Sequence, residues 1–429
     1  MTFWKKSPSA VLVGLLVIHV LAHVDRYILL GFSPQLIADL QLSNAQYGFL
    51  VGAVWVMSFG VMAVGLGALA DRYSRTRVIA GGLFVWSACT WASGHAQSFE
   101  QLALARFFVA SGEAALVPAA ASLLTELFSE RRRSTALGIF YTGIPLGVGC
   151  AFLLAGSIGA VHGWRMTFSV LGAIGIVIAF CLSFLKEDRG HLPAQERGAP
   201  FIDQLLNIFT VLRARKPLVL IIIGFVLVHV LFASLSFTQL WLVKERGMDG
   251  AAIAKHIGWL QLIFGTSGAV IGGLLGDRIG RRLPGGHPTL MLILVLLCGS
   301  AILAYRFSPP DSLMFNVGMC ASAFLPLSLY GSANASVMGM VPASMRATVT
   351  GFNMLSINLF AVALGSVIAG WAIDKMTRDG VDHPITKVLV STDLIVLSSS
   401  IFFAAAAWML VRRPFVPDVG HAEAPRAAL

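Results

Sequence analysis

The sequence predicts an all-α membrane protein in which twelve transmembrane helices form two pseudo-symmetric six-helix bundles. The chain of 429 residues has a mean hydropathy of +0.80, and only 12% of its residues are charged. Soluble domains carry about twice that share of charge. Apolar runs of about 20 residues, each long enough to cross a ~30 Å hydrocarbon core, recur along the chain. The helices are expected near residues 9–31, 47–70, 77–96, 99–128, 133–158, 164–185, 217–243, 253–276, 288–306, 311–341, 347–373 and 388–411.

Internal duplication explains why the helices divide into two sets. Residues 67–75 (GALADRYSR) and 273–282 (GLLGDRIGRR) are variants of one motif, and each follows a long apolar run. The two aspartates, Asp71 and Asp277, are 277 − 71 = 206 residues apart, close to half of the 429-residue chain. Repeats of this kind are typical of secondary transporters.

Composition also predicts where the bundles begin and end. Residues 1–185 are expected to form the N-terminal bundle and residues 217–413 the C-terminal bundle. Between them, residues 186–216 combine charge, Gly and Pro with a segment of helical apolar spacing, which predicts a linker with an amphipathic helix on the membrane surface. Residues 414–429 lack periodicity and are expected to be a disordered tail.

The net charge of +10 does not indicate nucleic acid as a partner, because of where the basic residues lie. Most of the 31 Lys and Arg fall in the N-terminal segment, the linker and alternate loops, which the positive-inside rule assigns to the cytoplasm. Both termini are therefore predicted to be cytoplasmic. We expect a monomer that spans a bacterial inner membrane several times.

Four charged side chains lie well inside predicted helices rather than at their ends. Asp25 and Arg26 fall in the first helix, and Arg106 and Glu113 fall in the fourth. A charge at mid-bilayer costs about 2.5 kcal/mol or more, so such residues are rare and mostly functional. The C-terminal bundle is expected to contain no comparable charge.

These four residues are predicted to couple transport to protons. Asp25 and Arg106 are expected at similar depth, while Glu113 lies two helical turns from Arg106 on the same face. A carboxylate beside an arginine can take up a proton and release the arginine for an anionic substrate. The alternative is a buried ion pair that only stabilises helix packing.

Polar and aromatic residues near the middle of other helices predict a substrate cavity that is charged on one side and apolar on the other. Such a cavity suits an amphipathic anion. The cavity residues are expected to be Arg106, Glu113, Tyr27, His229, Phe324, Tyr330, Asn334 and Asn358.

The duplicated motif predicts a conformational latch in the loops that follow the second and eighth helices. Its aspartate can accept hydrogen bonds from the amides at a neighbouring helix N-terminus, and adjacent basic residues complete a charge network. The latch residues are expected to be Asp71, Arg72, Arg75, Asp277, Arg278 and Arg281.

The sequence contains no pattern typical of an enzyme or a metal site. There is no HExxH, no GxSxG and no cluster of Cys with His, and the five cysteines are scattered singly. We therefore expect no catalytic residue, no metal and no cofactor.

The duplicated motif resembles that of the major facilitator superfamily, which implies the major facilitator fold. The first half also resembles the Spinster branch of lipid transporters, over roughly residues 20–185. The segments that carry this second resemblance are Asp25-Arg26-Tyr27, Gly112-Glu113-Ala114, Arg131-Arg132-Arg133 and Gly143-Ile144-Pro145-Leu146-Gly147, together with Arg106.

The Spinster resemblance implies proton-linked movement of lysophospholipids or sphingolipid-like amphiphiles by alternating access. It implies that Asp25 and Glu113 are the protonatable groups and that Arg106 is their partner or the headgroup contact. Two alternatives stay open, namely a proton-coupled symporter of small organic carboxylates and a passive uniporter.

Overall fold

The protein is built from α-helices, as the sequence predicts. The computed structural model describes residues 7–60, 62, 74–185, 208, 210, 212–280, 282–341 and 345–412, and this part of the chain contains no β-strand. The predicted disordered tail falls outside the described residues, and so does the predicted surface helix of the linker apart from residues 208, 210 and 212–216.

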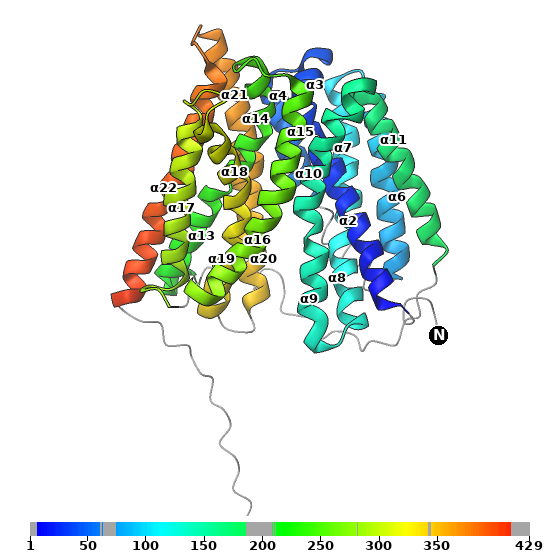
Figure 1. Cartoon of the computed structure of the whole chain (residues 1–429). Helices are drawn as coiled ribbons and strands as arrows, with labels where there is room; N and C mark the ends of the chain where they lie inside the picture. The colour runs from blue at the N-terminus through cyan, green and yellow to red at the C-terminus, as the bar shows by residue number, and fades with distance from the viewer. Residues whose placement is uncertain are drawn as a thin grey trace, which may run out of the picture.

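The helices of the first half form the right-hand bundle in Figure 1. They are α2 (Pro8–Gly31), α3 (Ser33–Asp39), α4 (Asn44–Gly48) with the π-helical η1 (Phe49–Ala53), α6 (Arg75–Ser93), α7 (Phe99–Glu113), α8 (Leu116–Leu127), α9 (Glu130–Tyr141), α10 (Gly143–Gly156) and α11 (Ile158–Ser183).

The helices of the second half form the left-hand bundle. They are α13 (Lys216–Val228), α14 (Leu231–Lys244), α15 (Gly250–Leu260), η2 (Gln261–Gly265), α16 (Thr266–Leu275), η3 (Gly276–Gly280), α17 (His287–Tyr305), α18 (Leu313–Ser328), α19 (Tyr330–Met340), α20 (Arg346–Ser356), η5 (Ile357–Leu364), α21 (Gly365–Arg378) and α22 (Pro384–Arg412).

Ten helical runs among the described residues are long and apolar enough to cross a membrane. The other two predicted spans correspond to the run that starts with α4, whose end lies outside the described residues, and to α6, which begins with two arginines. The protein is thus a multi-pass membrane protein, consistent with twelve spans.

Short polar caps start the helices at the upper end in Figure 1. The side chains of Ser43, Ser98, Asp249 and Ser312 each accept a hydrogen bond from the backbone N–H three residues later. Such caps satisfy amides that have no partner within the helix. In each case the cap lies at the end of a short turn that contains polar residues, and the next helix begins directly after it.

The two bundles contact each other at this upper end, which the charge distribution predicts to be the outer one. There α4 packs on α21, α10 on α15 and α3 on α14. The helices approach very closely, since a Cβ on Gly48 would lie 2.2 Å from the carbonyl oxygen of Ser366. At the opposite end α2 begins and α22 ends (Figure 1).

Candidate functional site

The four predicted intramembrane charges lie together in the N-terminal bundle. Asp25 and Arg26 are on α2, Arg106 is on α7, and Glu113 is the last residue of α7. The side chains of Asp25, Arg106 and Glu113 are buried, with exposed fractions of 0%, 5% and 6%. Asp25 lies within electrostatic range of both Glu113 and Arg106.

Glycines allow the helices that carry these charges to pack closely. A Cβ on Gly147 of α10 would lie 2.3 Å from the Cβ of His23 on α2. A Cβ on Gly112 of α7 would lie 2.5 Å from the carbonyl oxygen of Gly82 on α6. The small residues next to Glu113 and opposite α2 therefore bring the charged side chains into one space.

Trp55, which sequence reasoning missed, connects two of the charges. Its indole Nε1 donates a hydrogen bond of 2.7 Å to Oε2 of Glu113, and the guanidinium carbon of Arg26 lies 3.5 Å from its ring centroid. A guanidinium over a tryptophan face is a favourable cation–π contact. Trp55 thus binds the carboxylate with its edge and the cation with its face.

The expected pairing of Asp25 with Arg106 is not a direct ion pair among the described residues. The side chains of Thr90 and Trp86 lie beside the Asp25 carboxylate as possible donors, without meeting strict hydrogen-bond geometry. Nη2 of Arg106 instead donates to the carbonyl oxygen of Arg26 at 3.5 Å. Nη1 of Arg106 and Oε1 of Glu113 are also buried without a hydrogen-bond partner.

An arrangement with so many unsatisfied polar atoms is unfavourable by itself. Each buried group without a partner costs about 1–3 kcal/mol, and more if it is charged. Two carboxylates and two guanidiniums sum to zero formal charge, so the cluster is neutral but underbonded. A proton on one of the carboxylates, or an anionic group bound to Arg106, would lower this cost.

On the side of the C-terminal bundle, the structure brings two of the predicted cavity residues together. His229 lies between α13 and α14, fully buried, with its ring centroid 5.1 Å from that of Tyr330. Its Nδ1 donates to the carbonyl oxygen of Phe225 at 2.6 Å, which leaves Nε2 buried without a partner. Tyr330 in turn lies within electrostatic range of Arg26 and Tyr27 across the bundle interface.

The remaining predicted cavity residues are half-buried. The ring centroid of Tyr27 lies 5.3 Å from the guanidinium carbon of Arg26, whereas no contact among the described residues links Phe324, Asn334 or Asn358 to the four charges. Phe324 packs against the hydrophobic core, while Asn358 donates to the carbonyl oxygen of Met354 at 2.9 Å. Asn334 keeps Oδ1 buried without a partner. A cavity of ≈ 40 Å³ between the bundles, bordered by Pro145 and Gln261, is large enough for water but too small for an amphipathic anion.

Of the predicted latch residues, Arg75 has contacts that can be described. It forms an ion pair with Glu126 and donates to Oγ of Ser122 at 3.1 Å, which ties α6 to α8. Asp277 and Arg278 lie in η3. Asp71, Arg72 and Arg281 lie outside the described residues, so the latch stays a prediction.

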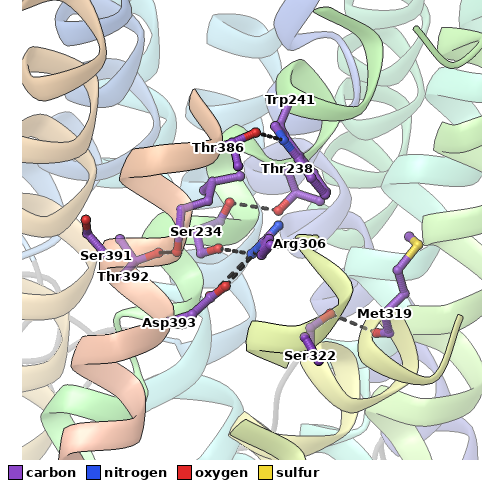
Figure 2. A network of polar contacts seen from close by, with 12 residues as sticks. Ser234, Thr238, Trp241, Arg306, Met319, Ser322, Thr386, Ser391, Thr392 and Asp393 are labelled. Atoms are coloured by element: carbon purple, nitrogen blue, oxygen red, sulfur yellow. Dashed lines mark hydrogen bonds and ion pairs between the residues drawn. The ribbon is translucent and has the colours of Figure 1, made fainter. Parts of the chain in front are cut away.

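The expectation that the C-terminal bundle lacks intramembrane charges is wrong. Figure 2 shows Arg306 with dashed lines to both Ser234 and Asp393. Nε of Arg306 donates to Oδ2 of Asp393 at 2.7 Å, and Nη2 donates to Oγ of Ser234 at 2.7 Å. The charged side chains are only 1% and 0% exposed.

The reason for this error is the length of the last helix. The apolar run suggests a start near 388, but α22 begins at Pro384, so Asp393 lies 393 − 384 = 9 residues into it. That places Asp393 about 13 Å below the helix start. Arg306 directly follows α17, and its guanidinium stacks on Tyr305 at 4.4 Å and on Trp241 at 4.9 Å from the ring centroids.

Comparison with known proteins agrees with this architecture. The family model of the Major Facilitator Superfamily matches residues 15–366. An MFS-type efflux pump of Mycolicibacterium smegmatis is 27% identical over 92% of this chain and 90% of its own length. The sphingosine-1-phosphate transporter SPNS2 of Xenopus tropicalis is 31% identical, but over only 46% of this chain and 39% of its own length.

Among solved structures, a bacterial homologue of the human lysosomal transporter Spinster, in an inward-facing and unoccupied conformation, has the same fold. It superimposes with a TM-score of 0.83 over 97% of this chain and 100% of that chain, at 21% identity.

Proposed function

We propose, from the premise that this chain belongs to the Major Facilitator Superfamily, that it is a proton-coupled secondary active transporter of an amphipathic organic anion. The chain is a membrane transporter and not an enzyme. The substrate class that we propose is a lysophospholipid or a sphingolipid-like molecule, moved by alternating access. The observation that carries the proposal is the buried cluster of Asp25, Arg26, Arg106 and Glu113 with its unsatisfied polar atoms.

In this proposal the carboxylates take up protons and a guanidinium takes the anionic group of the substrate. Protonation of Asp25 or Glu113 removes a negative charge from beside Arg106, which then has donors available for a phosphate or carboxylate. A proton gradient supplies about 1.4 kcal/mol per pH unit. His229 and Tyr330, surrounded by aromatic rings, would border the apolar part of the substrate.

The closed contacts at the predicted outer end support an inward-facing state. We propose that this end faces away from the cytoplasm, that both termini are cytoplasmic, and that the protein works as a monomer in a bacterial inner membrane. The substrate and conformation named for the Spinster relatives support the lipid-like substrate class and the inward-facing state.

The first test of the proposal is substrate-induced proton movement into proteoliposomes that contain a pH-sensitive dye. The wild type, Asp25→Asn and the control Asp311→Asn, a change in an exposed loop, would each receive lysophospholipids, sphingosine-type amphiphiles and small carboxylates. We expect a lipid-triggered signal that disappears in Asp25→Asn and persists in Asp311→Asn. Protein-free liposomes correct for passive leakage of the amphiphiles.

Two outcomes would replace the proposal. A signal triggered by carboxylates alone would make the protein a symporter of small organic carboxylates, which the two guanidiniums could also bind. Substrate movement without protons, equal in Asp25→Asn and wild type, would indicate a passive uniporter whose buried charges are structural.

A further inference from the structure

One carboxylate joins the two bundles at the predicted outer end. Asp374 of α21 accepts hydrogen bonds from the backbone N–H of Asn44 at 3.0 Å and from Nδ2 of Asn44 at 2.8 Å through Oδ1. Its other oxygen, Oδ2, accepts from the backbone N–H of Ala45 at 2.9 Å. Asp374 belongs to the C-terminal bundle, and both of its carboxylate oxygens therefore accept hydrogen bonds from the start of a helix in the N-terminal bundle.

The chemistry of this contact is favourable for a carboxylate. Asn44 begins α4, which continues without interruption through η1 to residue 60, so its first amides carry the positive end of a helix dipole. Hydrogen bonds to an ionised group contribute more than those between neutral groups. Ser43 and Gln46 form a capping box on the same helix turn and leave the Asn44 and Ala45 amides for Asp374.

We infer that Asp374 holds the two bundles together at the predicted outer end, and that its bonds to α4 break each time that end opens. This inference rests on the alternating access proposed above. It assigns to Asp374 the control of how often the outer end opens, a role that is separate from binding the substrate or the proton.

Other carboxylates at this end act within one bundle. Glu245, at the end of α14, accepts from the backbone N–H groups of Ile385 and Thr386 at 2.7 and 2.8 Å, at the start of α22. This is the same kind of contact as that of Asp374, but both partners belong to the C-terminal bundle. Glu245 is therefore a matched control for Asp374.

Around Asp374 the facing surfaces of the two bundles contain glycines in place of large side chains. Hydrogen bonds are therefore expected to contribute to holding these surfaces together. A Cβ on Gly370, one turn before Asp374, would lie 2.1 Å from the carbonyl oxygen of Asn44. A Cβ on Gly52 would lie 2.7 Å from the carbonyl oxygen of Val362. A further polar bond, from Tyr47 Oη to the carbonyl oxygen of Ser236 at 3.0 Å, joins neutral groups and is expected to be weaker.

The experiment measures distances between spin labels on the full-length protein, without substrate and without a proton gradient. The labels would be placed at Ala38→Cys on α3 and Asp379→Cys just after α21, both exposed, after replacement of the five native cysteines. We expect one short distance in the wild type and an added longer one in Asp374→Ala. The ratio of closed to open molecules should fall at least about ten-fold.

Glu245→Ala should lower thermal stability but leave the label distances as in the wild type. An unchanged distance distribution in Asp374→Ala, or an equal change in Glu245→Ala, would overturn the inference.

A second pair of variants tests the same contact independently. Gly370→Ala places a methyl group against α4 and should open the outer end, whereas Gly339→Ala in α19, where nothing lies within 4 Å of the added Cβ, should not. If Gly370→Ala and Gly339→Ala have the same closed distances, the contact between α4 and α21 does not control opening and the inference fails. Because this readout needs neither substrate nor protons, a wrong substrate class would leave its result unaffected.

Discussion

At the scale of the residue, Trp55 is the side chain that organises the candidate site. It receives Arg26 on its face and donates to Glu113 from its edge, so it separates a cation from an anion that could otherwise pair directly. A buried carboxylate whose second oxygen has no partner depends strongly on the one bond that remains.

Replacing Trp55 by phenylalanine should therefore impair transport. Trp55→Phe keeps an aromatic face for Arg26 but removes the N–H donor to Glu113, and we expect the initial rate of substrate-driven transport to fall about ten-fold, the effect of about 1.4 kcal/mol. The control is Trp164→Phe, which removes an indole N–H bond of 2.9 Å to Asp39 at the outer end. Equal rates in the two variants would contradict the organising role of Trp55.

The sequence points most clearly to a residue whose side chain contrasts with its surroundings. Asp25 and Glu113 stand out because ionisable groups are rare in apolar helices. Trp55 gave no such signal, because a tryptophan in an apolar run is expected for packing alone. Asp393 was overlooked because its depth depends on where α22 begins, and apolar periodicity locates helix ends only to within a few residues.

At the scale of the element, several helices are interrupted where candidate residues lie. Glu113 ends α7, His229 separates α13 from α14, and Tyr330 begins α19. The sequence predicts continuous helices over the first two of these regions. At this break, Nδ1 of His229 is a second donor to the carbonyl oxygen of Phe225, which also accepts the backbone N–H of His229 at 3.3 Å. In α18, Pro326 lacks the N–H that would continue the helix ladder, and the helix ends at Ser328.

The buried pair of Arg306 and Asp393 links α14, α17 and α22. We therefore expect it to contribute to the stability of the C-terminal bundle. Asp393→Asn leaves a buried guanidinium without a counter-charge, which costs about 3–5 kcal/mol and should lower the unfolding temperature in detergent. The double variant Arg306→Met with Asp393→Leu should regain much of that stability, since it removes both charges. A double variant as unstable as Asp393→Asn would show that the site requires the ion pair.

At the scale of the whole molecule, the sequence predicts the number and class of helices better than the relation between the bundles. The membrane thickness sets the length of each apolar run, and the internal duplication sets the positions of the repeated motif. Both features are therefore visible in a single sequence. The arrangement of the bundles cannot, because a transporter that works by alternating access must accommodate two arrangements with one sequence. Only the structure shows the close contact of α4 with α21 at Gly48 and Gly370.

Membrane orientation is a prediction at this scale that reporter fusions can check. The basic residues predict that the C-terminus is cytoplasmic and that the loop at residues 379–383, between α21 and α22, is outside. Green fluorescent protein should fluoresce when fused to the C-terminus, and alkaline phosphatase should be active only when inserted into that loop. The opposite pattern would invert the assignment of the outer end.

The bond between Asp374 and Asn44 also has a consequence for how the chain is made. Its partners are 330 residues apart in sequence, so α4 is inserted long before Asp374 is synthesised. Until then the first turn of α4 is capped by its own Ser43 and Gln46, which need no distant partner. Because nascent chains fold from the N-terminus, the first bundle can mature with an exposed outer edge. That outer edge can meet its partner only after the ribosome has synthesised α21.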